Sequence, residues 1–338
     1  MAVTEFTDFI RSVHSDYATT VSDGVLEDFV IFKEIERANG APRSYQGTVV
    51  GPGGFWKNAG GNQIEWRVMF DQMDYTTWGP GTNVSVVTPQ MLKNPVLTLG
   101  GYTLGYFIDR FETMSMNTKE QYIPLIKFYE QMLARRAYSM YETEILKNST
   151  TGGWKGLPAF IAASGTYATN VTLSDTYALP KVFDYSGSGQ TFGVTCVDRL
   201  FEVVNGATHG DSQGGAHSPS VAFMNRTDWQ TMHSVIEDSH RQIDVNTDML
   251  NFGFTNFTYA GVRCYWSDEM ALQSINKVYV LNTHHLGIAY ASDKLLSTET
   301  DKFITGSNVG VVAVSFHKGT PYCSNTRMQG MINNTTSS

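Results

Sequence analysis

Apolar residues recur at helical spacing in two stretches near the N-terminus, from about Thr4 to Tyr17 and from Ser22 to Ala38. Residues three and four positions apart lie on one face of a helix, so both stretches are predicted to be amphipathic helices. The apolar positions of the second stretch are Val25, Leu26, Phe29, Val30, Phe32 and Ile35. Asn39-Gly40 follows directly and favours the end of the helix there.

After Gly40 the pattern changes to short alternating segments separated by glycines, and this continues to about Pro89. The apolar positions of one such segment are Ile64, Trp66, Val68 and Phe70. A spacing of two is typical of a strand with one buried face, so we predict a strand in a long two-stranded excursion. A second extended segment, from Val96 to Phe107, is rich in β-branched and aromatic residues.

A long helix is predicted from about Pro124 to Lys147. Proline suits the first turn of a helix, and one apolar stripe follows it. The stripe consists of Leu125, Tyr129, Met132, Leu133, Ala137, Met140, Tyr141 and Ile145. At 1.5 Å per residue the helix is about 36 Å long. We expect the stripe to pack against a sheet.

The second half of the chain mixes both periodicities, with helices expected at Thr195 to Val204 and Thr227 to Ser239. Strands are expected at Ser220 to Met224, Val262 to Trp266, Lys277 to Leu281 and Gly310 to Phe316. Together these elements indicate the α+β class.

The composition of the chain restricts what its surface can do and which partners it can bind. Charged residues make up 17% of the 338 residues, below the roughly 25% of an ordinary soluble domain, so much of the surface is expected to serve contacts. The formal net charge is −8, which argues against tight binding of a polyanion.

Cysteines and termini indicate the compartment. Cys196, Cys264 and Cys323 are odd in number and far apart, which favours buried reduced thiols over disulfides. Met1 to Asp8 lacks a signal-peptide pattern, and no apolar run reaches the eighteen or so residues that span a bilayer. We expect a protein kept in the cytoplasm, without a membrane partner.

One motif suggests an enzyme. Residues 210–214 fit the pattern of a serine nucleophile elbow, with Ser212 at its centre and His209 and His217 beside it. Such an elbow needs a strand before the serine and a helix after it, whereas turn formers flank this one. A serine hydrolase using Ser212 is therefore an alternative that the flanking sequence disfavours.

Metal and cofactor motifs are incomplete. Asp244, Asn246 and Asp248 alternate as in a calcium loop, but the glycine and glutamate that such loops need do not follow. His284 and His285 are adjacent, and as strand residues they would point to opposite faces. The chain has no phosphate-binding loop motif. We expect no catalytic residues, no cofactor and no metal.

Aromatic residues mark the glycine-rich excursion, where basic residues are too sparse for a nucleic-acid groove. Aromatics on an extended arm more often anchor a protein partner. We therefore predict intersubunit contacts at Trp56, Lys57, Trp66 and Trp78. A monomeric binding module that uses exposed aromatics is a further alternative.

The order of these elements resembles the Hong Kong 97-type major capsid protein family of tailed bacteriophages. Local similarities lie at Gly156 to Ile161 after the long helix, at Ala222 to Trp229, at Tyr259 to Trp266 and at Asn308 to Phe316. The resemblance implies an N-terminal arm, an extended E-loop, a peripheral domain with a long spine helix, and an axial domain. The implied bounds are 1–39 for the arm, 40–90 for the E-loop, 91–149 and 256–309 for the peripheral domain with its spine helix at 121–147, and 150–255 and 310–338 for the axial domain.

The resemblance also implies a function without catalysis. Subunits of this family self-assemble into pentamers and hexamers of an icosahedral shell around double-stranded DNA, which they contact non-specifically. Expected partners are further copies of the chain, a scaffolding protein, a portal and a decoration protein. The expected location is the virion capsid, assembled in the host cytoplasm.

Overall fold

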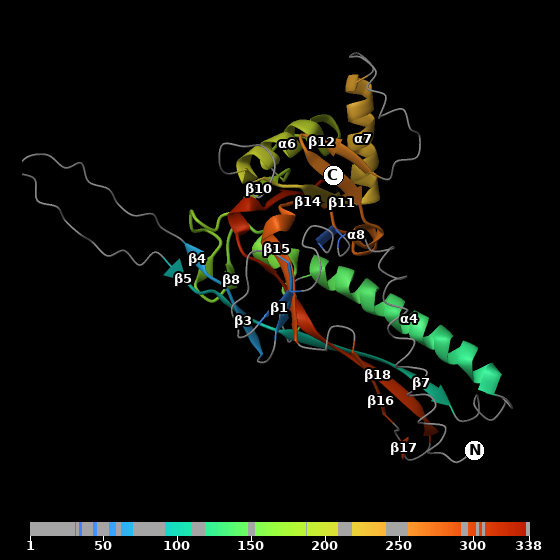
Figure 1. Cartoon of the computed structure of the whole chain (residues 1–338). Coiled ribbons are helices and arrows are strands. Elements are labelled where there is room, and N and C mark those ends of the chain that lie inside the picture. Colours follow the sequence, from blue (N-terminus) through green and yellow to red (C-terminus); the bar gives the residue numbers. More distant parts are fainter. Residues whose placement is uncertain are drawn as a thin grey trace, which may run out of the picture.

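The computed structural model describes residues 31, 34–35, 43–45, 54–58, 62–69, 92–109, 119–147, 153–186, 188–208, 218–240, 256–291, 297–301, 304–305 and 308–335. These residues form two large mixed sheets, three two-stranded ladders and several helices. The two sheets lie at opposite ends of an elongated molecule, and the long helix α4 runs from one toward the other (Figure 1). The α+β class predicted from the sequence is thus confirmed.

The six-stranded sheet forms the upper lobe in Figure 1. Its strand order is β10 (Lys181–Asp184), β19 (Gly330–Asn333), β14 (Lys277–Leu281), β11 (Val221–Met224), β13 (Val262–Trp266) and β12 (Asn256–Tyr259). Two helices, α6 (Phe192–Ala207) and α7 (Arg226–His240), pack against it and close a core around Cys196, Leu200 and Met232. The helices and strands predicted for this region are confirmed, and β13 and β14 have the predicted bounds.

The seven-stranded sheet contains the longest strand, β18 (Asn308–Cys323). The other strands are β1 (Arg43–Tyr45), β2 (Gly54–Asn58), β7 (Gly100–Asp109), β15 (Leu286–Ala291), β16 (Ser297–Asp301) and β17 (Ile304–Thr305). β7 pairs with β18 in antiparallel register from Gly100 opposite Gly319 to Asp109 opposite Gly310. We call this pair the β7–β18 ribbon.

Two short antiparallel ladders form the predicted two-stranded excursion. β3 (Gln63–Glu65) pairs with β6 (Val96–Thr98), and β4 (Val68–Met69) pairs with β5 (Leu92–Lys93). Ile64 and Trp66 are buried and Arg67 is exposed, as the alternation predicts. Phe70 lies outside the described residues. The third ladder is the hairpin of β8 (Thr166–Ala168) and β9 (Val171–Thr172).

The predicted long helix is α4 (Lys119–Leu146), which begins before Pro124 and lies along the β7–β18 ribbon (Figure 1). Tyr129 stacks on Tyr106 of β7, with ring centroids 5.2 Å apart. Ala137, Tyr141 and Ile145 are fully buried. Met132 is 53% exposed, so its predicted place in the packed stripe is wrong. The buried residues cluster in the C-terminal half, where α4 also meets α5 (Leu157–Phe160) and α8 (Asp268–Leu272).

The first part of the expected E-loop belongs to the seven-stranded sheet. β2 pairs in parallel with β15, from Gly54 opposite Gly287 to Asn58 opposite Ala291, and β1 pairs with β2. These residues therefore belong to the seven-stranded sheet, and the excursion begins only at β3. The prediction from glycine content was wrong here because backbone pairing with a distant strand leaves no local signal.

The two sheets also divide the chain differently from the expected domains. β12, β13 and β14, expected in the peripheral domain, pair with β11 in the six-stranded sheet. β18, expected from Gly310 in the axial domain, is the centre of the seven-stranded sheet, and only β19 after it joins the six-stranded one.

The end of the expected N-terminal arm is anchored in the subunit. Ile31, Glu34 and Ile35 are helical and buried, while the first predicted helix lies outside the described residues. Glu34 pairs with Arg263 of β13 at 2.9 Å and accepts a hydrogen bond from the Tyr265 hydroxyl at 3.0 Å. A buried carboxylate needs such partners, so these contacts fix where the helix lies on the sheet.

Candidate interaction surfaces

Trp66, one of the four predicted contact residues, lies inside the subunit. Its indole is 2% exposed and lies between Tyr167 and Tyr322, with ring centroids 5.8 and 5.9 Å away. The prediction that Trp66 contacts a neighbour is corrected accordingly, because this side chain has almost no surface to offer. An aromatic at alternate spacing on a half-buried strand is as well suited to a core as to an interface.

Of the other predicted contact residues, Trp56 and Lys57 both belong to β2. The Trp56 indole is half-buried and packs against the main core cluster, which leaves part of it accessible. The side chain of Lys57 and the whole of Trp78 lie outside the described residues. The structure thus leaves Trp56 as the one described member of the set with surface for a partner.

The outer side of α6 carries an apolar strip that the sequence prediction missed. Val194 is 77% exposed and Phe201 46% exposed, and a spacing of seven residues places them on one helix face. The helix itself was predicted, but exposure on one side of it depends on which face the six-stranded sheet covers. Two large apolar side chains in solvent are the composition expected at the centre of a protein interface.

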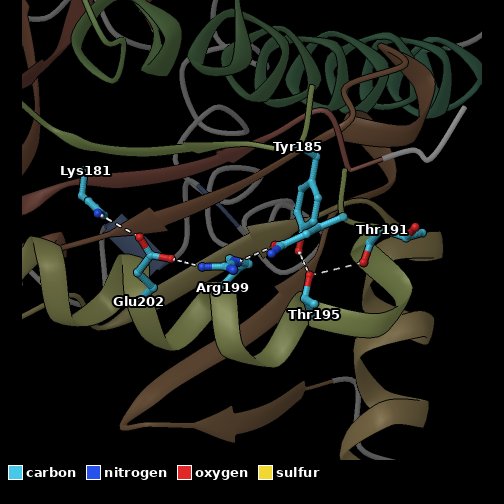
Figure 2. Close-up of polar contacts among 7 residues, drawn as sticks. Lys181, Tyr185, Thr191, Thr195, Arg199 and Glu202 are labelled. Carbon is cyan, nitrogen blue, oxygen red and sulfur yellow. Dashed lines mark hydrogen bonds and ion pairs between the residues drawn. The ribbon is translucent and has the colours of Figure 1, made fainter. Parts of the chain in front are cut away.

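A group of charged residues joins α6 to β10 (Figure 2). Glu202 pairs with Lys181 of β10 at 3.1 Å and with Arg199 one helical turn before it. Arg199 also donates from Nε to Gln190 at 3.0 Å and lies over the Phe183 ring, 4.6 Å from its centroid. The Arg199 and Lys181 cations lower the pKa of Glu202. These contacts hold α6 against β10 and the loop between them.

The same figure shows a neutral group at the start of α6. The Tyr185 hydroxyl and the Thr195 hydroxyl are 3.0 Å apart, and Thr195 donates to the Thr191 carbonyl at 3.3 Å (Figure 2). These bonds hold the loop after β10 against the first turn of α6. These hydrogen bonds fix the orientation of α6. The groups they join are hydroxyls and a carbonyl, which do not form a catalytic triad or dyad.

A buried group of one imidazole and two hydroxyls joins α4 to β18. His317 of β18 lies between Tyr141 and Ser315, whose hydroxyl is 2.7 Å from His317 Nε2. Ser315 and His317 are each 1% exposed. A nucleophile that no substrate can reach does not catalyse hydrolysis, so this group joins α4 to β18 as a structural contact. Ser212 and its flanking histidines lie outside the described residues.

A second buried polar contact joins α4 to α8. Ser267 donates to Glu142 at 2.7 Å, and Glu142 is 4% exposed. Burial, together with the nearby Glu269 and Asp268 carboxylates, raises the pKa of Glu142 to about 7. A similar carboxyl, Asp228 at the start of α7, accepts from Thr335 at 2.5 Å, and burial raises its pKa to about 6.

Among the described residues, the metal ligands suggested by the sequence do not come together. Within the described part of the chain, no three His, Cys, Asp or Glu side chains are grouped so as to hold an ion. His284 and His285 belong to a 3-10 turn, η4 (Thr283–His285), so their predicted strand conformation is wrong. Asn282 caps this turn by accepting from the His284 amide, which favours the turn over an extended strand. Residues 244–248 lie outside the described residues.

The three cysteines are free and buried, as predicted. Burial raises the pKa of Cys264 and of Cys323 to about 12, so neither thiol ionises near neutral pH. Among the helices in the described ranges, none combines the length and apolar character needed to cross a bilayer.

No protein-family model matches the chain, and no curated protein matches it. Solved structures do match. The capsid of cyanophage A-1(L) aligns with a TM-score of 0.55 at 11% identity, covering 81% of this chain and 89% of that one. The capsid of a native GTA particle aligns with a TM-score of 0.52 at 9% identity, covering 88% of each chain.

The capsid of cyanophage Pam1 aligns with a TM-score of 0.51 at 13% identity and covers 82% of this chain and 86% of that one. Identities this low carry information about the fold and not about particular residues. The three alignments each extend over at least four-fifths of the chain, and therefore over both sheets. The chain has the fold of phage capsid proteins.

Proposed function

We propose that this chain is the major capsid protein of a tailed bacteriophage, which assembles into pentamers and hexamers of an icosahedral shell. The observation that carries the proposal is the alignment with phage capsid proteins over at least four-fifths of the chain. A capsid subunit works by its shape and its contacts, and no substrate site is needed.

The surface of the subunit supports self-association. Val194 and Phe201 on α6, and Phe128 and Met132 on α4, are large apolar side chains that a lone subunit exposes to water. The two pairs lie on different lobes, so a contact that uses both kinds of surface joins unlike patches of neighbouring copies. Such heterologous contacts close into rings, as pentamers and hexamers require.

The six-stranded sheet with α6 and α7 corresponds in this proposal to the axial domain, and the seven-stranded sheet with α4 to the peripheral domain. The excursion from β3 to β6 corresponds to the E-loop. Trp56, Lys57 and Trp78 are the proposed contacts with an adjacent subunit in this region. The partners are further copies of the chain, a scaffolding protein, a portal and a decoration protein.

The shell would enclose double-stranded DNA without binding it tightly. The net charge of −8 provides few cations to neutralise phosphates, so DNA can pack against the inner surface without adhering to it. The proposed location is the virion capsid, after assembly in the host cytoplasm.

Sedimentation and negative-stain microscopy of the expressed chain, alone and with a co-expressed scaffolding protein, test the proposal. We expect closed particles or rings of five or six subunits. A protein that sediments only as a 37.5 kDa monomer under every condition would refute the shell function. A fluorophosphonate probe tests the alternative hydrolase, and stoichiometric labelling of Ser212 would favour it.

A further inference from the structure

Two segments that connect the six-stranded sheet to the seven-stranded sheet lie side by side. β14 leads through η4 into β15, and β18 leads in the opposite direction through η5 (Thr326–Met328) into β19. The strand pairings on the two sides stop at Val280 opposite Gly330 and at Leu286 opposite Cys323. We call the two stretches between these pairs the crossing: residues 281–285 and 324–329.

The two turns of the crossing are built in the same way. Each starts with the sequence Asn-Thr, and the asparagine side chain accepts a hydrogen bond from the backbone amide two residues later. Asn282 accepts from His284 at 3.0 Å, and Asn325 accepts from Arg327 at 3.2 Å. Asparagine stabilises turns by this bond to its own backbone. Both connections between the sheets are therefore short, capped turns with a defined conformation.

Gln329 joins the two turns where backbone pairing is interrupted. Its side-chain carbonyl accepts from the Asn282 amide at 2.9 Å, and its side-chain amide donates to the Asn282 carbonyl at 3.2 Å. Gln329 is 0% exposed and Asn282 is 1% exposed. The side chain thus takes the place of a paired strand residue. On the other side of the crossing, the Ser324 amide donates to the His285 carbonyl at 2.9 Å, and the Ser324 hydroxyl lies 3.0 Å from His285 Nδ1.

Hydrogen bonds and apolar contacts constrain the two lobes differently. The core cluster around α4 also joins the lobes, because it contains Phe223 of one sheet and Ile288 of the other. Burial of apolar area is non-directional, so such a contact tolerates small rotations. The paired bonds of Gln329 require one geometry, since a rotation would leave buried polar groups of Asn282 without partners. The crossing is therefore the part of the subunit that defines the angle between the lobes.

We propose that Gln329 is a positioning residue of assembly: its hydrogen bonds with Asn282 fix the angle between the lobes, and this angle sets the curvature of the shell. The second step rests on the proposed shell function. In that function a contact joins unlike patches of neighbouring copies, such as Phe201 on α6 and Phe128 on α4. The angle between the lobes then determines the angle between neighbouring subunits.

The distance between two spin labels, one on each lobe, measures this angle. Asn205→Cys on α6 and Thr103→Cys on β7 provide exposed attachment points, whereas the native cysteines are buried. Labelled chains are diluted with an excess of the same chain without labels, so that distances within one subunit are measured. Gln329→Met removes both side-chain hydrogen bonds and keeps a long unbranched side chain. The matched control Thr335→Val removes a buried hydroxyl bond to Asp228 inside the six-stranded lobe.

We expect one narrow distance distribution in the wild type and in Thr335→Val, although the control loses stability. Gln329→Met should broaden the distribution about two-fold or more, because the lobes gain orientations that the paired bonds exclude. Ser324→Ala keeps the backbone bond to His285 and should broaden the distribution less. This milder variant decides the question if Gln329→Met does not fold. A distribution as narrow as that of the wild type in the folded crossing variants would overturn the proposal.

Electron microscopy of the unlabelled chains measures particle diameter. Particles of Gln329→Met should vary in diameter, while those of Thr335→Val should have the wild-type diameter. A broad distance distribution with particles of the wild-type diameter would overturn the effect on curvature and leave the fixed angle standing. A wild-type chain that forms no particles, but loses its narrow distribution in Gln329→Met, would overturn the shell function and again leave the fixed angle standing.

Discussion

Gly156 shows how one residue sets the position of the segment that follows α4. A Cβ atom at this position would overlap the carbonyl oxygens of Lys147 and Ile145 and would lie 2.6 Å from that of Glu144. These are backbone atoms at the end of a helix, which cannot move aside as a flexible side chain can. Glycine is therefore required where the chain turns back against α4.

We predict that Gly156→Ala lowers the free energy of unfolding by about 2–4 kcal/mol, as severe steric changes in a packed interior do. The measurement is equilibrium unfolding in urea. Gly193→Ala is the matched control, because a Cβ there meets only Thr231 Cγ2 at 3.7 Å and the residue is helical. That change should raise stability by up to about 1 kcal/mol. Equal effects of the two substitutions would contradict the close approach at Gly156.

The buried Glu142 makes the stability of the subunit depend on pH. Its pKa is about 7 in the folded chain, against an ordinary value of 4.5. Between these values the folded state binds more protons than the unfolded state, so the free energy of unfolding falls as pH rises through this window. Asp228, with a pKa of about 6, contributes in the same direction at lower pH.

We predict that Glu142→Gln removes the part of this slope between pH 6 and 7 and makes the protein more stable than the wild type at pH 8. The gain should be on the order of 2–3 kcal/mol, since each unit of pKa shift corresponds to about 1.4 kcal/mol. Glutamine can still accept the Ser267 hydroxyl bond, so the contact between α4 and α8 is retained. Denaturant unfolding at several pH values measures the effect. A variant with the wild-type slope from pH 6 to 7 would mean that Glu142 ionises normally.

At the scale of elements, the hairpin of β12 and β13 contains a strained turn. Ala260 and Gly261 join the strands with φ values of +51° and +79°. Two-residue turns of this hand suit the twist of a hairpin, but they favour asparagine followed by glycine. Alanine in the left-handed region carries a conformational cost that asparagine partly avoids.

We predict that Ala260→Asn raises the free energy of unfolding by about 0.5–1 kcal/mol, because the backbone conformation is unchanged and its cost is lower. Thermal unfolding detects the change. Thr258→Asn, two residues away on the exposed side of β12, is the control and should be neutral or slightly destabilising. A loss of stability in Ala260→Asn would indicate that Ala260 packs against another group.

The sequence predicts well those helices and strands whose pattern of apolar residues is complete within the element itself. α4, α6, α7, β13 and β14 each show a full period of apolar residues between clear breaks, and the structure has them at or near the expected bounds. β2 and the sheet membership of β18 could not be predicted, because pairing between distant strands is decided by the whole fold. The same reason applies to the candidate surfaces: Trp66 became a core residue and Val194 an exposed one through packing that no local pattern records.

At the scale of the whole molecule, α4 joins the two lobes. Its C-terminal half, from Tyr138 to Leu146, packs into the core cluster that also contains Phe223 of the six-stranded sheet and Ile288 of the seven-stranded one. Its N-terminal half lies along the β7–β18 ribbon, where Tyr129 stacks on Tyr106, and Phe128 and Met132 remain exposed there. The helix therefore holds the lobes in one arrangement and also presents apolar surface at its far end. Both properties suit a subunit that must keep its shape while neighbours bind to it.

The last prediction concerns residues 70–91, which connect β4 to β5 and include Trp78. The ladder pairs Met69 with Leu92 at its end, so the two strands can be joined there by a two-residue Asn-Gly turn. We predict that a chain with this short connection folds with an unchanged unfolding temperature, because β3 to β6 keep all their pairings. It should nevertheless fail to form particles in sedimentation, since the proposed contact of Trp78 with a neighbour is removed. A second variant replaces the segment with a Gly/Ser sequence of the same length, and it separates the effect of segment length from that of the aromatic side chains. A third variant, Trp78→Ala, measures the contribution of that indole alone. If the shortened chain still forms normal shells, these residues do not hold neighbouring subunits together.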